Sequence, residues 1–124
     1  MELEQKKILI VDDNLELAEM VAKLLAHSGF QVSIAPDGKT ALRKVLSESP
    51  GVVLLDLNLP DMAGGEVLKE IKGMNKDTAV IILTAYGGEQ VAVDLMKAGA
   101  EDFISKPFNN ELLIHAVKEG FKIR

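Results

Sequence analysis

The stretch VVLL at residues 52–55 decides the fold class, because it is an unbroken apolar run that stops at the carboxylate of Asp56. The runs KILIV at residues 7–11 and AVIIL at residues 79–83 have the same character. Runs this short and this continuously apolar are typical of strands that are buried on both faces, as in a parallel sheet. We therefore predict three central strands.

Two weaker segments predict the edges of the sheet. FQVSI at residues 30–34 alternates apolar and polar residues, which suits an edge strand with one wetter face. DFIS at residues 102–105 is the shortest candidate and would form the other edge.

The segments between the strands carry apolar residues three and four positions apart, which is the helical period. These stripes are Leu17, Met20, Val21 and Leu24; Ala41, Leu42, Val45 and Leu46; Val67, Leu68 and Ile71; Val91, Leu95, Met96 and Ala98; and Leu113, Ala116, Val117 and Phe121. Strand and helix thus alternate five times. That order predicts an α/β fold with an open, doubly wound parallel sheet.

Turn residues separate these elements. Glycine often ends a helix with a positive φ angle, and we expect that conformation at Gly29, Gly51, Gly73 and Gly99. Residues 1–124 are too few for two domains of ordinary size, so we expect one domain.

Composition excludes several classes of protein. The chain has no cysteine, which excludes a disulfide scaffold and a thiolate metal site and fits a reducing, cytoplasmic location. Its net charge is −5 and it has no cluster of Lys and Arg, so we expect no direct binding to DNA. Charged residues interrupt every apolar run, so we expect no membrane association.

Polar side chains follow the predicted strands at the point where each strand ends. Asp12 and Asp13 follow the first strand, Asp56 the third and Thr84 the fourth, and Lys106 follows the fifth. In an open α/β sheet the ligand site lies beyond the carboxyl ends of the strands. If the first and third strands are neighbours, three carboxylates share one pocket. Their repulsion favours a divalent cation, and a set of oxygen ligands without His or Cys suits Mg²⁺.

The same residues suit phosphoryl chemistry. A carboxylate can attack phosphorus and form an aspartyl phosphate, while Lys106 and Thr84 supply a positive charge and a hydroxyl for the phosphoryl oxygens. No evident base stands ready to hydrolyse that intermediate quickly. We therefore expect a phosphoacceptor with slow self-dephosphorylation at most, and not an enzyme.

Four sequence segments then reveal a resemblance that covers most of the chain. They are ILIVDDN (8–14), VVLLDLNLPDMAGGE (52–66), VIILTAYG (80–87) and GAEDFISKPF (99–108). The chain resembles the receiver domains of two-component response regulators. The resemblance implies a flavodoxin-like sheet with strand order 2-1-3-4-5 and five helices.

The resemblance also implies roles for the residues at the strand ends. Asp56 matches the phosphoacceptor and, with Asp12, Asp13 and the backbone carbonyl of Asn58, the Mg²⁺ ligands. Thr84 matches the switch hydroxyl that binds phosphate.

Further roles follow from the same resemblance. Lys106 matches the phosphate-pairing lysine, and its bond to Pro107 matches a cis peptide. Phe103 matches a switch aromatic residue, although it lacks the hydroxyl of a tyrosine. Asn58 and Tyr86 match positions that tune the phosphate lifetime, and we expect Tyr86 to shield the acyl phosphate from water.

The function implied is a phosphorylation switch that takes its phosphoryl group from a phosphohistidine on a sensor histidine kinase or a phosphotransfer protein. Phosphorylation would remodel the face formed by the fourth helix, the fifth strand and the fifth helix, for binding an output domain, a target protein or a second copy of the chain. The residues expected on this face are Gln90, Asp94, Lys97, Glu101 and Lys118. His27 and His115 are expected at the surface, without a role in phosphotransfer.

Three alternative functions fit the sequence less well. A phosphatase of the haloacid-dehalogenase type needs a second aspartate two residues after the nucleophile, where this chain has Asn58, and its paired acids come late in the chain. A flavodoxin-like electron carrier needs a phosphate-binding loop where this chain has Asp12 and Asp13. An adaptor that is never phosphorylated would not need the full set of acids, hydroxyl and lysine. Whether the domain stands alone or belongs to a longer regulator stays open.

Overall fold

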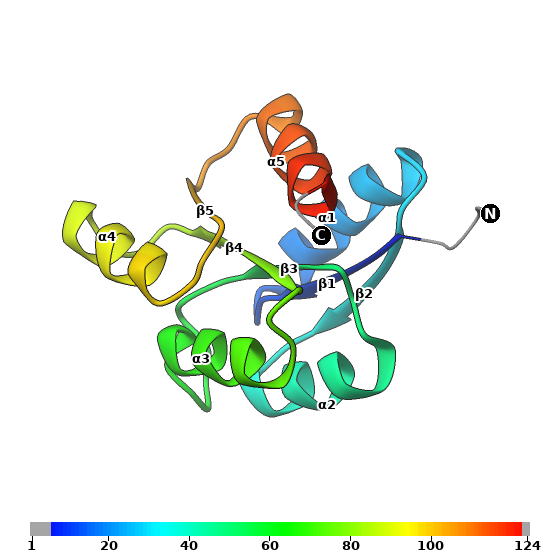
Figure 1. Cartoon of the computed structure of the whole chain (residues 1–124). Coiled ribbons are helices and arrows are strands. Elements are labelled where there is room, and N and C mark those ends of the chain that lie inside the picture. The colour runs from blue at the N-terminus through cyan, green and yellow to red at the C-terminus, as the bar shows by residue number, and fades with distance from the viewer. Residues whose placement is uncertain (1–5, 123–124) are drawn as a thin grey trace.

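A computed structural model describes residues 6–122, which form a five-stranded sheet (Figure 1). All neighbouring strands pair in parallel, and their order is β2-β1-β3-β4-β5. The strands are β1 (Lys7–Val11), β2 (Gln31–Ala35), β3 (Val52–Leu55), β4 (Ala79–Thr84) and β5 (Asp102–Ser105). The predicted α/β fold class, strand order and alternation of strands and helices are therefore confirmed.

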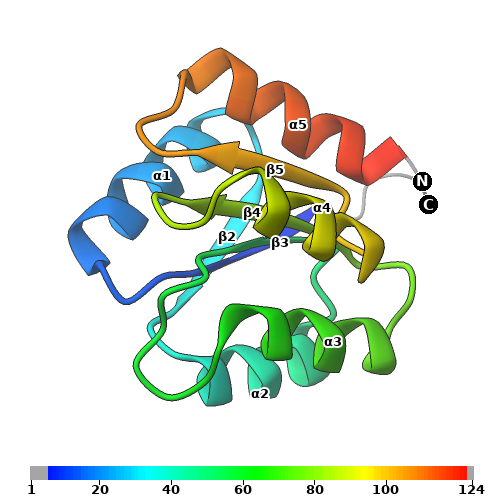
Figure 2. The same ribbon diagram turned by 90° about the vertical axis from the view of Figure 1, so that its left-hand side faces the viewer.

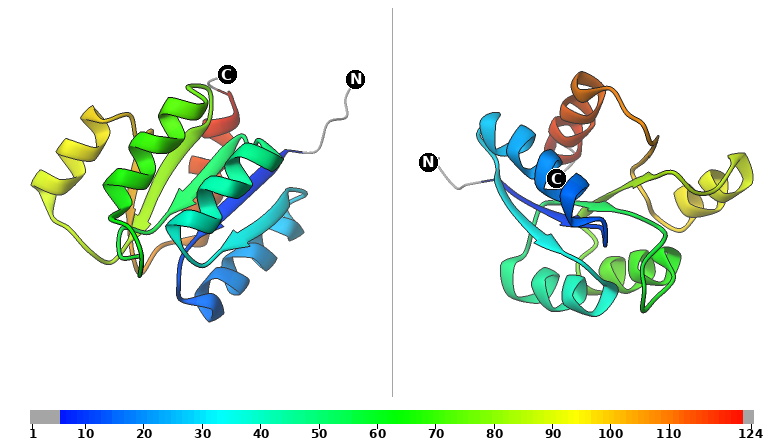
Figure 3. Two further views of the ribbon diagram at one scale, coloured as in Figure 1. Left: turned by 90° about the horizontal axis from the view of Figure 1, so that it is seen from below. Right: turned by 180° about the vertical axis from the view of Figure 1, so that it is seen from behind.

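Five helices, one after each strand, complete the described part of the chain. They are α1 (Leu15–His27), α2 (Gly38–Glu48), α3 (Gly64–Met74), α4 (Glu89–Lys97) and α5 (Asn110–Lys122). Helices α1 and α5 cover one face of the sheet, and α2 and α3 cover the other (Figure 2). Seen from below, α2 and α3 lie over the near face, and α4 lies to the side of α3 (Figure 3). None of these helices is long and apolar enough to cross a membrane.

Alternate strand residues build two cores, one on each face of the sheet. Ile8 and Ile10 of β1 pack under α1 and α5, whereas Leu9 and Val11 pack against α2 and α3. All four are almost completely buried. Each such side chain contributes about 1.5–3 kcal/mol of transfer free energy. An unbroken apolar run is thus what a strand with two covered faces requires.

The helical stripes are less completely buried than the sequence pattern predicts. Leu46 of α2 is 74% exposed and Met20 of α1 is 58% exposed. In α4 only Leu95 is buried, while Val91 and Met96 remain exposed. The helical period located the helices correctly but overestimated the width of their buried faces.

Two of the four glycine predictions are wrong. Gly29 and Gly99 have positive φ angles, as expected after α1 and α4. Gly73, however, lies inside α3, and Ser49, with φ 49°, ends α2 in place of Gly51. Gly51 instead permits close packing, because an added Cβ there would lie 2.5 Å from the Phe121 ring.

Candidate functional site

The carboxylates of Asp12, Asp13 and Asp56 lie together at the carboxyl ends of β1 and β3. These strands are neighbours, and their register places Val11 opposite Leu55, so the next residue of each strand enters the same pocket. The Asp56 amide donates to the Val11 carbonyl at 2.9 Å, which continues the pairing by one step. One oxygen from each of the three carboxylates lies within 4.8 Å of the others. Asp12 and Asp56 are buried, whereas Asp13 is exposed.

Lys106 reaches this cluster from the loop after β5. Its Nζ lies 2.7 Å from Oδ2 of Asp12 and 3.3 Å from Oδ2 of Asp56. Pairing of β5 with β4 continues through the Lys106 amide, which donates to the Thr84 carbonyl at 2.9 Å. The peptide bond between Lys106 and Pro107 is cis.

Thr84, the last residue of β4, links the acid cluster to the β4–α4 loop. Its Oγ1 donates to Oδ1 of Asp56 at 2.6 Å and accepts from the Tyr86 amide at 3.2 Å. The side chain is fully buried. One hydroxyl therefore joins the carboxylate of Asp56 to the first residues of the β4–α4 loop.

Main-chain amides hold the two buried carboxylates. The Asn58 amide donates to Oδ1 of Asp56 at 3.3 Å, and the Asn14 amide donates to Oδ1 of Asp12 at 3.0 Å. Asn14 in turn caps α1 by accepting from the Leu17 amide at 3.1 Å. Local turns thus fix both acids before any ligand arrives.

Burial and charge shift the pKa values in this cluster. Burial raises the pKa of Asp12, and the hydrogen bonds from Lys106 and the Asn14 amide only partly offset that effect. Burial alone would lower the pKa of Lys106, but the hydrogen bond and charge of Asp12, together with the charge of Asp56, outweigh it and raise that pKa. Three carboxylates face one ammonium, so the pocket attracts cations.

The donor set fits Mg²⁺. All three side chains offer oxygen, and no cysteine or histidine belongs to the cluster. Hard divalent cations prefer such ligands, and Mg²⁺ typically keeps several waters on one or two carboxylates. The exposed position of Asp13 brings solvent to one member of the cluster.

The other residues predicted from the sequence differ in exposure. Phe103 is partly buried and packs against the core beneath α2, α3 and α4. The Tyr86 side chain is 54% exposed. His27 and His115 are exposed. On the face formed by α4, β5 and α5, the residues Gln90, Asp94, Lys97 and Lys118 are exposed, and Glu101 is half-buried.

Sequence reasoning missed Asp61. This residue lies in the loop that follows Asp56, and its carboxylate accepts hydrogen bonds from the amides of Gly38 and Lys39 at 2.8 and 3.0 Å. These bonds lower the pKa of Asp61. Its partners stand more than twenty positions earlier in the chain, so no local pattern could reveal the contact.

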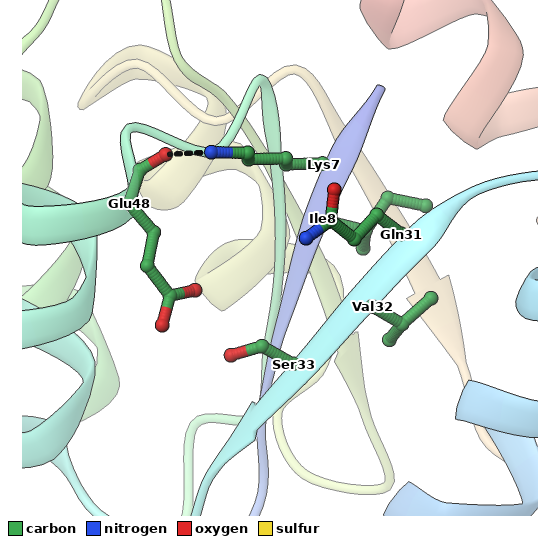
Figure 4. A pocket seen from close by; sticks show the side chains of 6 residues that line it. All are labelled: Lys7, Ile8, Gln31, Val32, Ser33 and Glu48. Atoms are coloured by element: carbon green, nitrogen blue, oxygen red, sulfur yellow. Dashed lines mark hydrogen bonds between the residues drawn. The ribbon is translucent and has the colours of Figure 1, made fainter. Parts of the chain in front are cut away.

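A cavity of about 240 Å³ lies elsewhere, at the amino ends of β1 and β2 (Figure 4). It is lined in part by Lys7, Gln31 and Glu48, and the ammonium of Lys7 donates to the Glu48 carbonyl at 3.4 Å. The acid cluster is at the opposite ends of the strands, so the cavity is not part of the candidate site.

Known proteins share both the sequence and the fold. A family model described as the response regulator receiver domain matches residues 8–118. The chemotaxis protein CheY of Bacillus subtilis is 36% identical over 114 residues, which cover 91% of this chain and 95% of that protein. The regulatory protein AtoC of Escherichia coli is also 36% identical, over 95% of this chain but only 26% of its own length.

Solved structures agree with these matches. A CheY-like receiver domain protein from Methanospirillum hungatei superposes with a TM-score of 0.92 at 32% identity, covering 97% of this chain and 96% of that one. The receiver domain of NtrX from Brucella abortus gives a TM-score of 0.89 at 31% identity, covering 94% and 99%. The fold, the strand-end residues and the matched family agree: this chain belongs to the response regulator receiver domains of two-component systems.

Proposed function

We propose that this receiver domain accepts a phosphoryl group on Asp56 in a Mg²⁺-dependent reaction and thereby acts as a switch. The observation that carries the proposal is the convergence of Thr84 and Lys106 on the two oxygens of Asp56, at 2.6 and 3.3 Å. A hydroxyl and an ammonium beside one buried carboxylate are donors suited to the oxygens of a transferred phosphoryl group.

The proposed donor is a phosphohistidine on a sensor histidine kinase or a phosphotransfer protein. A carboxylate oxygen of Asp56 attacks phosphorus, a P–O bond forms and the P–N bond breaks. The imidazole nitrogen leaves with the electron pair and takes up a proton. The ammonium of Lys106 already lies near both buried acids, so it can pair with the phosphoryl oxygens without a large movement.

The proposed Mg²⁺ ligands are the carboxylates of Asp12, Asp13 and Asp56 and the backbone carbonyl of Asn58. When bound, the ion would neutralise charge on the phosphoryl oxygens during transfer. The support for this assignment is the excess of negative charge in an oxygen-only cluster.

The proposed switch follows from the position of Thr84. Phosphorylation places new negative charge where its hydroxyl now binds Asp56. If Thr84 moves toward the phosphate, the hydrogen bond from the Tyr86 amide to its hydroxyl breaks or changes position. The β4–α4 loop and the start of α4 would then move as well. Phe103 packs against the core cluster that contains Leu95 of α4, and we propose that its ring moves with α4. The remodelled face would bind an output domain, a target protein or a second copy of the chain.

Receiver domains are generally regulatory, and we assign this one the same role, as a phosphoacceptor with slow self-dephosphorylation. We further propose that residues 1–124 constitute one receiver domain that acts in the cytoplasm and does not itself bind DNA. Asn58 and Tyr86 are proposed to set the lifetime of the phosphate.

Intact-mass measurement tests the proposal. The wild type, Asp56→Asn and the exposed control Asp94→Asn are incubated with acetyl phosphate or phosphoramidate, with Mg²⁺ or with EDTA. We expect one phosphoryl group on the wild type and on Asp94→Asn, only with Mg²⁺, and none on Asp56→Asn. A folded wild type that takes no phosphoryl group from these donors or from a phosphorylated histidine kinase would overturn the proposal and favour an adaptor.

A further inference from the structure

The loop after β3 is a closed hairpin, residues 57–64, which we call the β3–α3 hairpin. At its base the Gly64 amide donates to the Leu57 carbonyl at 3.2 Å, and Asn58 pairs with Ala63 in an antiparallel bridge. Gly64 has no space for a side chain, because an added Cβ would lie 2.6 Å from Cα of Leu57. The hairpin is therefore a defined unit and not an open loop.

The tip of this hairpin is fastened to α2. The two oxygens of Asp61 accept from the amides of Gly38 and Lys39, the first two residues of that helix, at 2.8 and 3.0 Å. These amides have no partner inside the helix, and the helix dipole favours a carboxylate at this end. Met62 packs beside the anchor, since a Cβ on Gly38 would lie 2.7 Å from its Sδ.

The base of the same hairpin touches the acceptor site. The Asn58 amide donates to Oδ1 of Asp56 at 3.3 Å, and the Asn58 carbonyl is a proposed metal ligand. A displacement of the tip therefore reaches Asn58 through a short, hydrogen-bonded ladder.

We propose that Asp61 is a positioning residue that holds the β3–α3 hairpin against α2 and so places the Asn58 main chain beside Asp56. The part of this inference that concerns Mg²⁺ rests on the proposed function. The role of Asp61 in placing the hairpin does not, because it can be measured without metal.

Asp37 provides a matched control at the same helix end. Its carboxylate accepts from the Thr40 amide at 2.7 Å and caps α2. It does not belong to the hairpin. Removing either carboxylate deletes one negative charge and one set of helix-end hydrogen bonds, but only Asp61→Ala releases the tip.

Amide hydrogen exchange, followed by NMR in metal-free protein, gives the first readout. We expect the amides of Asn58 and Gly64 to exchange faster in Asp61→Ala than in Asp37→Ala, with Asp61→Asn between Asp61→Ala and the wild type because one acceptor oxygen remains. Equal exchange in Asp61→Ala and Asp37→Ala would overturn the proposal, since the effect would then come from the helix end alone.

Calorimetric titration with MgCl₂ gives the second readout. We expect Asp61→Ala to raise the Mg²⁺ dissociation constant by about tenfold, the lower end of the range for residues that orient metal ligands. Asp37→Ala should keep the wild-type value. Unchanged binding in Asp61→Ala, or equal weakening in both variants, would contradict the metal part of the inference. If the wild type bound no Mg²⁺, the proposed function would fail, while the exchange rates would still decide the role of Asp61.

Discussion

The Lys106 ammonium lies 2.7 Å from Oδ2 of Asp12, although 94 positions separate the two residues in the chain. Topology brings them together, because β1 and β5 deliver their carboxyl ends to the same edge of the sheet. One ammonium does not balance the pocket, because the carboxylates of Asp13 and Asp56 belong to the same cluster as Asp12.

The first prediction concerns alkaline pH. The pKa of Lys106 is raised above its ordinary 10.5, so its charge stabilises the fold below that pH, and this contribution is lost as pH rises through the raised value. We expect the free energy of unfolding of the wild type, minus that of Lys106→Met, to fall above pH 10.5. Urea unfolding at several pH values measures it. The exposed control Lys97→Met should show no such change, and a difference that is constant with pH would contradict the prediction.

The second prediction concerns metal removal. Because burial raises the pKa of Asp12, its ionised form at neutral pH costs stability when no cation is bound. In EDTA we expect Asp12→Asn to unfold at a higher urea concentration than the wild type. With Mg²⁺ at a hundred times its dissociation constant the wild type should gain about 2.7 kcal/mol, and the order of the two proteins should reverse. A variant less stable than the wild type in EDTA would be inconsistent with this account.

The strands and the strand-end acids were predictable from sequence for a physical reason. A strand that is covered on both faces must be apolar throughout. The run VVLL at residues 52–55 is therefore recognisable as such a strand, and Asp56 marks its end. Given that β1 and β3 are neighbours, which the family resemblance implies, parallel register places Asp56 beside Asp12. The apolar pattern of each of these two strands therefore also locates the acid that follows it.

Contacts set by tertiary packing were not predictable. The carboxylate of Asp61 finds its partners on α2, and the close approach of Gly51 to Phe121 joins opposite parts of the chain. Leu46 continues a helical stripe but is 74% exposed. The β2 strand begins one residue later than expected, at Gln31, because the pairing with β1 decides its ends and the alternating pattern does not.

The third prediction tests the hydroxyl of Thr84. Thr84→Val keeps the shape of the side chain but deprives Asp56 of a donor and the Tyr86 amide of an acceptor. We expect the free energy of unfolding to fall by about 1–3 kcal/mol, the cost of buried polar groups without partners. The variant should still accept a phosphoryl group, yet the amide resonances of α4 should not shift on phosphorylation. Thr84→Ser, which retains the hydroxyl, should keep the shift; a normal shift in the valine variant would refute the switch role.

The fourth prediction concerns the lifetime of the acyl phosphate. If the ring of Tyr86 shields the phosphate from water, Tyr86→Ala should lose its phosphoryl group faster than the wild type. Tyr86→Phe retains the ring and should keep the wild-type rate. Intact mass followed over time after removal of the donor measures both rates. Hydrolysis no faster in Tyr86→Ala would argue against shielding.

The last prediction compares two adjacent glycines at the start of α3. A Cβ on Gly64 would lie 2.6 Å from Cα of Leu57 and 3.1 Å from the carbonyl oxygen of Asp56, so backbone must move. A Cβ on Gly65 would meet only Leu95, at an ordinary 3.5 Å.

Gly64→Ala should therefore cost about 1–3 kcal/mol of stability and slow phosphorylation, because the strain falls on the peptide of the acceptor itself. Gly65→Ala should be neutral or stabilising by up to about 1 kcal/mol, since alanine favours a helix, and should phosphorylate at the wild-type rate. Urea unfolding and the rate of phosphoryl uptake measure these effects. Equal behaviour of the two variants would mean that the hairpin yields without disturbing Asp56.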